Sequence, residues 1–503
     1  MNIIKVKSVI NPSKSYEYVD DGNPKVGGVK DVYFSPDKKY AVAFFRDFID
    51  FNHKESIKKI VTLYHNNIKN GNSSGYFLDE IYRWPYDAVE KNGKWGVIVP
   101  FYSGKFFFKK GYTANETIKN GEKVGKWFTT ASFRNKQYPL SLDRSELGDW
   151  LSYFQIAINI SRGVKKMHQM GLAHSDLSYN NVLVDPVTKS ACIIDIDGLV
   201  VPGLIPAKVI GTADFIAPEV LKTKHLNIGD PNRILPNQKT DLHALPVLIY
   251  MYLLRRHPFR GGKIWDLDAE KDEILAMGEK AVFIEHPENP INRVKTNHLK
   301  KWNMFWGDPK KLPFTITGPY LTELFKKAFI DGLHNPILRP IANEWETALL
   351  KTVDLIQPCS NPDCDEKWYV FDNTSAPRCP FCGTPYKGSL PVIDLYYKFK
   401  DNVWKPENHR LMVYHNQYLF KWHASRKVIR NESLTPEDKK PVGYFTFYQN
   451  KWMLVNQGLS SMKDLSENKV IPVNSMVEIR DGKKIMLSDE EGGRLMYITL
   501  THN

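Results

Sequence analysis

The stretch Ala173–Asn181 constrains this chain more than any other, because it sets an acid and an amide at a fixed spacing beside apolar residues. Asp176 stands five positions before Asn181, and a second acid, Asp195, follows directly after an apolar run. Two short strands joined by a turn at Asp185–Thr188 are expected here. The three polar side chains would therefore lie within about one hairpin of one another.

An acid, an amide and a second acid in this order suit phosphoryl transfer, which needs groups that orient a hydroxyl and hold Mg²⁺. Asp176 would orient the hydroxyl, and Asn181 and Asp195 would hold the metal. Asp and Asn are also common turn residues, so a plain loop is the alternative. The spacing favours the first interpretation, because it matches the pattern H-R-D-L-x-x-x-N.

The N-terminal part predicts strands at Val32–Phe34 and Tyr40–Phe45, separated by the turn Ser35–Asp37. Gly27 and Gly28 come just before the first strand. A glycine pair beside a strand lets the backbone approach phosphates, although any tight turn also uses glycines.

A nucleotide-binding lobe also needs a cation for the phosphates. Arg46 lies near the place where V-A-I-K would put a lysine, but Phe45 occupies the lysine position itself. Lys30, inside the glycine turn, is the other candidate, and the sequence favours neither. The helical stripe Lys54–Ile68 carries one acid, Glu55. Glu55 pairs with that cation or is favoured by the helix dipole in the first turn.

Four further segments follow in a fixed order. Apolar stripes predict a long buried helix at Leu147–Met170, ending at a glycine. Ala217–Glu219 contains an A-P-E signature after Asp195. Asp241 opens a strongly apolar helix, and Arg339-Pro340 begins a later helical segment.

Over residues 20–355 the order of these motifs resembles the protein-kinase superfamily. More narrowly, the chain is similar to bacterial kinase–zinc-ribbon proteins associated with tellurium-resistance gene clusters. The resemblance implies a bilobal kinase-like fold, with an N-lobe at 1–102 and a C-lobe at 103–355. It implies ATP and Mg²⁺ as cofactors and Ser/Thr-type transfer to a protein substrate in a stress-response module. It also implies two partners, a von Willebrand factor A-type protein and a metal-dependent protein phosphatase.

Transferred residue by residue, the resemblance assigns the substrate hydroxyl to Asp176 and the Mg²⁺ to Asn181 and Asp195. His174 would have a structural role. The supporting contacts that it implies are an ion pair of Glu219 with Arg339 and a brace of the catalytic loop by Asp241.

Four departures from the kinase pattern bear on activity. Ser175 replaces the Arg of H-R-D, Ser178 replaces the catalytic-loop Lys, Asp197 replaces the Gly of D-F-G, and the V-A-I-K lysine has no match. A single Arg in such centres is worth roughly 10³–10⁵ in rate, so lost cations matter. Because the metal-binding set is kept, we predict an active kinase, with a nucleotide-binding pseudokinase scaffold as the alternative.

Four of the five cysteines form the pattern Cys359-x₄-Cys364 and Cys379-x₂-Cys382. Four thiolates suit a closed tetrahedral Zn²⁺ site, which stabilises structure rather than catalysing a reaction. Disulfides and an iron–sulfur cluster are the alternatives. We therefore predict a zinc ribbon at residues 356–388. A zinc-ribbon protein that binds nucleic acid is a third functional hypothesis.

Residues 389–503 alternate between short apolar strands and polar turns, which is typical of a β-sandwich. The segments Trp452–Gln457 and Val477–Leu487 resemble a forkhead-associated domain, a family that binds phosphothreonine. The Ser-x-x-His segment of that family has no counterpart here. The predicted fold class is therefore multidomain α+β: a bilobal kinase-like fold, a zinc ribbon and a C-terminal β-sandwich.

The bulk composition is that of a soluble globular protein, with 42% hydrophobic and 25% charged residues over 503 positions. The net charge of +13 gathers in Lys105–Lys126 and Lys295–Lys311, where solvated faces are favoured over nucleic-acid binding. The longest apolar run, Ala244–Leu254, is too short to span a bilayer, and no signal peptide is expected. The predicted location is the cytoplasm, with no membrane contact.

Overall fold

A computed structural model describes residues 2–26, 29–70, 75–201, 211–227, 229–373 and 375–501. The chain divides into two compact units, each made of segments that are not contiguous in sequence. The first comprises Met1–Gly148, Gln155–Pro309 and Phe325–Glu344. The second comprises Asp149–Phe154, Lys310–Leu324 and Trp345–Asn503. Each unit is described by itself.

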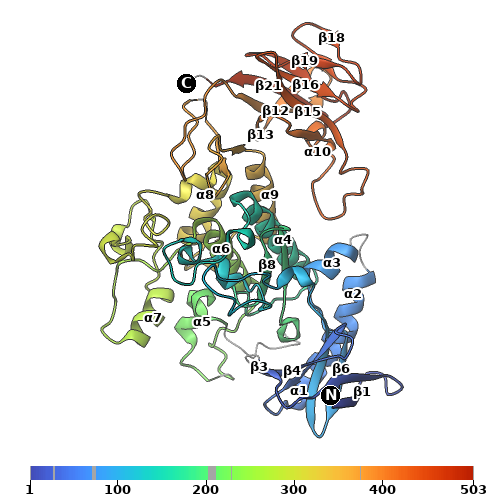
Figure 1. The fold of residues 1–503 in the computed structure, drawn as a ribbon, viewed down its shortest axis with the longest axis vertical. Coiled ribbons are helices and arrows are strands. Elements are labelled where there is room, and N and C mark those ends of the chain that lie inside the picture. The colour runs from blue at the N-terminus through green and yellow to red at the C-terminus, as the bar shows by residue number, and fades with distance from the viewer. Residues whose placement is uncertain are drawn as a thin grey trace. The chain divides into compact units, whose positions relative to one another are not determined.

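The first unit begins with a seven-stranded sheet of order β2-β1-β6-β7-β5-β4-β3, drawn in blue in Figure 1. Every neighbouring pair of these strands is antiparallel. The strands are β1 (Ile3–Ser8), β2 (Ser15–Val19), β3 (Lys25–Val26), β4 (Lys30–Phe34), β5 (Tyr40–Phe45), β6 (Asp87–Lys91) and β7 (Lys94–Pro100).

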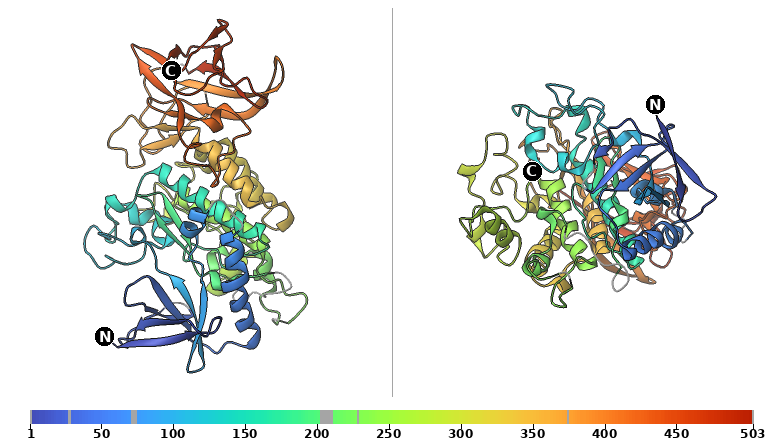
Figure 2. Two further views of the ribbon diagram at one scale, coloured as in Figure 1. Left: turned by 90° about the vertical axis from the view of Figure 1, so that its right-hand side faces the viewer. Right: turned by 90° about the horizontal axis from the view of Figure 1, so that it is seen from below.

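A helical stretch lies against one face of this sheet (Figure 2, left). It consists of α1 (Phe51–Lys59), the wider turn η1 (Ile60–Tyr64) and α2 (His65–Asn70), with α3 (Gly75–Ile81) following. Strand side chains alternate between faces, so Phe45 packs with Ile57 and Val61 of the helical stretch, whereas Phe44 packs on the opposite face. Phe45 therefore faces the helical stretch, and Phe44 faces away from it.

The remaining helices carry the chain through the rest of the kinase-like region. α6 starts at Gln238, before the Asp241 that the sequence placed at its opening, because Asn237 and Thr240 form a capping box. Every residue of α6 from Thr240 to Leu254 is buried, as a uniformly apolar helix requires. The elements are α4 (Trp150–Gln169), β8 (Val182–Asp185), β9 (Ser190–Ile193), α5 (Pro218–Thr223), α6 (Gln238–Leu254), α7 (Ala269–Met277), α8 (Pro319–Lys326) and α9 (Ala342–Val353).

The second unit contains a short hairpin, β10 with β11, and two larger antiparallel sheets. The larger sheets have the orders β13-β12-β21-β20-β17-β18 and β14-β15-β16-β19. Their bounds are β10 (Ile356–Pro358), β11 (Trp368–Val370), β12 (Pro391–Lys400), β13 (Val403–Met412), β14 (Tyr418–Phe420), α10 (Lys421–Ala424), β15 (Pro441–Tyr448), β16 (Lys451–Asn456), β17 (Lys463–Asp464), β18 (Lys469–Val470), β19 (Met476–Glu478), β20 (Lys484–Met486) and β21 (Arg494–Leu500).

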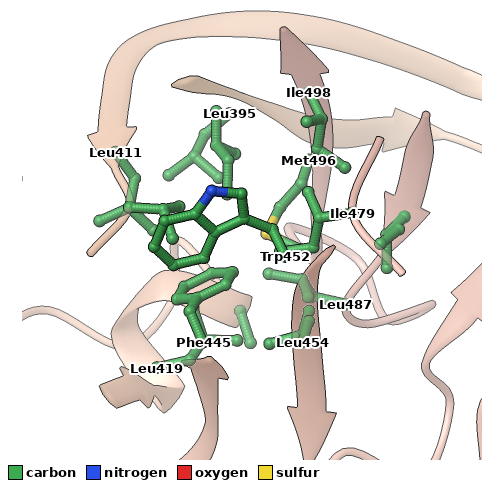
Figure 3. Close-up of a cluster of buried hydrophobic side chains, with 14 of the residues drawn as sticks. Leu395, Leu411, Leu419, Phe445, Trp452, Leu454, Ile479, Leu487, Met496 and Ile498 are labelled. Carbon is green, nitrogen blue, oxygen red and sulfur yellow. The ribbon is translucent and has the colours of Figure 1, made fainter. Parts of the chain in front are cut away.

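Both sheets contribute to one hydrophobic cluster, centred on the indole of Trp452 (Figure 3). Leu395 and Met496 come from the first sheet, and Phe445 and Leu454 from the second. This shared core explains the alternation of apolar and polar residues along these strands.

Candidate active site

The loop after α4 is held by one buried carboxylate of α6. Asp241, which is 1% exposed, accepts hydrogen bonds from the backbone N–H groups of His174 (2.8 Å) and Ser175 (3.1 Å). His168 Nε2 lies 3.0 Å from the same carboxylate. Ser175 has a left-handed φ of +70°, which these two bonds stabilise. The predicted brace of the loop by Asp241 is confirmed.

Asp176 is fixed by donors on both sides. Its Oδ1 accepts from the backbone N–H (2.7 Å) and the hydroxyl (2.9 Å) of Thr212. Its Oδ2 accepts from Asn181 Nδ2 at 2.9 Å, and that amide also donates to the Asp176 carbonyl at 2.8 Å. The Thr212 hydroxyl lies 3.1 Å from Ser178 Oγ. The carboxylate is therefore held in one orientation before any substrate arrives.

Asp195 follows β9, and a backbone bond connects its strand to Asn181. The Ile194 N–H donates to the Asn181 carbonyl at 3.0 Å. Asp195 itself has a left-handed φ of +63°, and its side chain is 44% exposed. The structure thus brings Asp176, Asn181 and Asp195 together at the end of the β8–β9 hairpin, as the sequence predicted.

Lys30 is the cation beside this acidic group. Its Nζ lies 2.7 Å from Asp195 Oδ1 and 2.7 and 2.8 Å from the two oxygens of Asp197. Lys30 in β4 pairs directly with Phe45 in β5, so it lies opposite the residue that occupies the V-A-I-K lysine position. Of the two candidate cations, Lys30 is the one that lies beside Asp195.

The charges of this triad follow from burial and contact. Burial alone would lower the pKa of Lys30, but the Asp197 and Asp195 carboxylates more than reverse this and raise it. The Lys30 ammonium lowers the pKa of Asp195. Burial raises the pKa of Asp197 despite Lys30. Lys30 therefore stays charged and bridges two carboxyl groups.

The other predicted nucleotide-binding residues either have other partners or lie outside the described residues. Arg46 is exposed, and its Nε lies 3.8 Å from Asp31. Glu55 accepts from Lys58 at 2.6 Å and is not paired with Lys30, and it also lies beyond the first turn of α1. The physical reason is that Asp195 and Asp197 already surround Lys30, while Lys58 lies one helical turn from Glu55. Gly27 and Gly28 lie outside the described residues.

A second predicted contact is also formed. Arg339, 3% exposed, donates from its two terminal nitrogens to the two carboxylate oxygens of Glu219, at 2.7 and 2.8 Å. Such a bidentate fork is geometrically specific. The predicted ion pair of the A-P-E glutamate with Arg339 is therefore confirmed.

Sequence reasoning missed the roles of Thr212 and Asp197. In the sequence, Thr212 is only one residue of the segment before A-P-E. Its hydroxyl is the one signal that could have indicated a hydrogen bond to the catalytic loop. Asp197 stands out only as a departure from D-F-G. Its spacing of two from Asp195 does not reveal that both carboxylates converge on a lysine from a distant strand.

The cysteine cluster lies in the second unit. The four sulfurs of Cys359, Cys364, Cys379 and Cys382 all lie within 4.8 Å of one another. Sγ–Sγ distances are 3.5 Å for Cys359–Cys382 and 3.9 Å for Cys364–Cys379. A tetrahedral Zn²⁺ with Zn–S bonds of about 2.3 Å separates sulfurs by about 3.8 Å, whereas a disulfide joins them at about 2.05 Å. The donor set therefore fits Zn²⁺ and not disulfides.

Comparison with known proteins agrees with the geometry of the first site. Residues 142–310 match the family model of the protein kinase domain. The serine/threonine-protein kinase PknD of Chlamydia abortus is 27% identical over 142 residues, which are 24% of this chain and 14% of that protein. The dual serine/threonine and tyrosine protein kinase of Apis mellifera is 27% identical over 186 residues, 36% of this chain and 17% of that protein.

Among solved structures, the kinase domain of a Toxoplasma gondii specific rhoptry antigen matches with a TM-score of 0.39 and 13% identity, over 70% of this chain and 86% of that chain. The family match confirms that the chain contains a protein kinase domain, as the motif order predicted. The chain spans less than a fifth of the length of the two kinases named above.

Proposed function

We propose that this chain is an ATP- and Mg²⁺-dependent protein kinase that phosphorylates Ser or Thr. Asp176 would orient the substrate hydroxyl, Asn181 and Asp195 would hold Mg²⁺, and Lys30 would contact the phosphates. Mg²⁺ would supply neutralisation of the phosphate charge. The protein's own contribution would be positioning, because phosphoryl transfer asks little covalent chemistry of the enzyme.

One observation carries this proposal: the Asp176 carboxylate is oriented from both sides, by Asn181 and by Thr212. A plain turn needs no such contact with a segment 36 residues further along the chain. The close approach of Lys30 to Asp195 supports the same assignment, because it sets a cation beside the metal-binding acid.

The test uses the full chain with Mg²⁺, ATP labelled on the γ-phosphate, and a library of Ser-, Thr- and Tyr-containing peptides. We expect labelled phosphoserine or phosphothreonine, and loss of label in Asp176→Asn. The control is Asp401→Asn, at a side chain 92% exposed in the second unit, which should transfer normally. Equal transfer by Asp176→Asn would contradict the assignment.

A pseudokinase scaffold is the second candidate, and the additional contact of Lys30 with Asp197 favours it, as do two missing cations. Lys30 Nζ is shared by Asp195 and Asp197, and Ser175 and Ser178 stand where kinases have cations. A chain of this kind would bind nucleotide with Mg²⁺ but transfer no label. The same assay therefore separates the two functions.

We infer that the four cysteines bind one structural Zn²⁺. The distances between their sulfurs support this. We expect about one zinc per chain, because a structural zinc site takes four protein ligands and the cluster supplies one such set. Cys379→Ser should lose it, whereas Cys192→Ala, at a buried cysteine outside the cluster, should keep it. Zinc retained by Cys379→Ser would refute the site.

The finer parts of the proposal rest on family resemblance. They place the kinase in the cytoplasm, in a tellurium-resistance-like signalling module with a von Willebrand factor A-type protein and a metal-dependent phosphatase. The proposed domains are 1–102, 103–355, 356–388 and 389–503. The two sheets that share one core support a forkhead-associated-like β-sandwich for the last of these. Co-purification of both partners with the tagged chain would test the module.

A further inference from the structure

A pocket of about 330 Å³ opens in the second unit, and none of the proposed catalytic residues lines it. Gln357 and Tyr386, from the segment that carries the cysteine cluster, are part of its lining. Tyr414, from the loop after β13, and Phe447 and Trp452, from β15 and β16, line it as well. Pockets of this size with aromatic walls and few polar groups are typical of ligand sites.

The walls are mainly aromatic rings, and Pro358, Leu390 and His415 complete them. Trp452 is 5% exposed and anchored in the core (Figure 3), and its Nε1 donates to the Ser389 carbonyl at 2.9 Å. Phe447 is 46% exposed, with its ring centre 5.2 Å from that of Trp452. Burial raises the pKa of Tyr386 and of Tyr414, so both phenols remain neutral near pH 7. A guest would therefore meet π faces and the imidazole of His415, whose Nδ1 accepts from the Phe447 N–H at 3.1 Å.

Gln357 supplies the polar group. It is 0% exposed, and its Nε2 donates to the Val413 carbonyl at 3.1 Å, which sets the orientation of the amide. Its Oε1 is buried and has no hydrogen-bond partner in the described part of the chain. Buried acceptors in proteins are almost always paired. A ligand that brings an N–H donor would satisfy this oxygen.

The chemistry of the guest follows from these two features. Among the described residues that line the pocket there is no Asp, Glu, Lys or Arg. A guanidinium group is planar, carries five N–H donors and no acceptor, and stacks on aromatic faces. A nucleotide would bring acceptors and phosphates for which this lining has no cation. We propose that the pocket binds the guanidinium of an arginine side chain of a partner protein, stacked on these rings with an N–H donated to Gln357 Oε1.

Ligand-observed NMR on the full chain tests this with N-acetyl-arginine amide. The comparison probes are the lysine amide, the uncharged citrulline amide and adenosine. We expect saturable binding of the arginine probe, weakened about 3-fold or more by loss of one ring in Phe447→Ala. Tyr448→Ala is the matched control: Tyr448 is the next residue of β15, is 54% exposed and points to the opposite face.

Gln357→Met gives a second, independent reading, because it removes the acceptor; binding should weaken about 5-fold. Thermal melts of each variant establish that it folds. The proposal is overturned if the arginine probe does not saturate, or if Phe447→Ala leaves its affinity unchanged. It is also overturned if citrulline, lysine or adenosine binds as tightly with the same dependence on Phe447.

Discussion

Thr212 connects the loop after α4 with the segment before A-P-E. Its hydroxyl donates to Asp176 and lies beside Ser178, where kinases have a lysine. We predict that Thr212→Val lowers kcat by about 10-fold, the effect expected for one lost orienting hydrogen bond of about 1.4 kcal/mol. The KM for ATP should change little. Thr212→Ser, which keeps the hydroxyl, should retain activity, and steady-state kinetics would measure both.

Removing Lys30 should affect activity more than removing the Thr212 hydroxyl does, but it also leaves a buried acid without its cation. Lys30→Met alone would leave Asp197 without its cation, which is destabilising in itself. We therefore compare Lys30→Met/Asp197→Gly with Asp197→Gly, since Gly restores the D-F-G pattern. Loss of Lys30 should lower kcat/KM for ATP by about 10²-fold.

The control for Lys30 is Arg46→Met, at the other candidate cation, which should leave kcat/KM for ATP unchanged. The assignment would be reversed if Arg46→Met abolished kcat/KM for ATP while Lys30→Met/Asp197→Gly and Asp197→Gly had equal values. The sequence could not distinguish Lys30 from Arg46, because the choice depends on the register of β4 against β5. Only the pairing of β4 with β5 shows that Lys30 lies opposite Phe45, the residue in the lysine position.

At the scale of elements, Asp354 joins three segments of the second unit. It follows α9 and is 6% exposed, with Oδ2 2.7 Å from His409 Nε2 in β13. Its Oδ1 lies 3.4 Å from His423 Nε2 in α10 and 3.7 Å from Arg430. Burial would raise the pKa of Asp354, but His423 and His409 outweigh it and hold this pKa far below its usual range.

A depressed folded-state pKa stabilises the fold above the unfolded pKa of about 3.9, and this contribution is lost as pH falls. Asp354→Asn should lower the unfolding free energy of the second unit by about 3 kcal/mol near pH 7. The difference from the unchanged chain should shrink below about pH 4. Denaturant titrations at several pH values would measure it. Asp394→Asn, in a half-exposed pair with Arg410, should change stability by less than about 1 kcal/mol. A pH-independent difference would contradict this account.

Periodicity predicted the strongly patterned elements and failed where apolar residues are sparse. The strand Tyr40–Phe45 was predicted with its bounds, and the helix before the loop was predicted closely. The first thirty residues are polar and rich in turn-forming residues, yet β1 and β2 form a hairpin in which Val6 and Tyr16 are buried. The apolar run that begins at Tyr418 includes Trp422, but β14 stops at Phe420, because His423 Nδ1 accepts from the Phe420 N–H and starts α10.

For the whole molecule, the two units interleave along the sequence. No helix in the described ranges is long and apolar enough to span a membrane. The second unit includes Asp149–Phe154, although this segment lies within the predicted C-lobe. Trp150 packs edge-on against Phe381 with ring centres 4.9 Å apart, and the backbone N–H of Trp150 donates to the Glu366 carbonyl at 3.1 Å. A boundary at residue 355 would therefore remove the partners of Trp150.

This interleaving predicts different behaviour for two truncated chains. Residues 1–355 lack Glu366 and Phe381, so the Trp150 amide should lose protection against hydrogen exchange and its indole should become exposed. Residues 1–388 keep both partners and the four cysteines, so with Zn²⁺ present the protection should persist. Hydrogen exchange read by mass spectrometry on peptides covering 149–154 measures the difference. Equal protection in the two truncations would mean that α4 is held without the cysteine segment. Protection lost from both would mean that the strands after residue 388 are also needed, because Val392 and Met412 pack with Cys364 and Cys379 in one cluster.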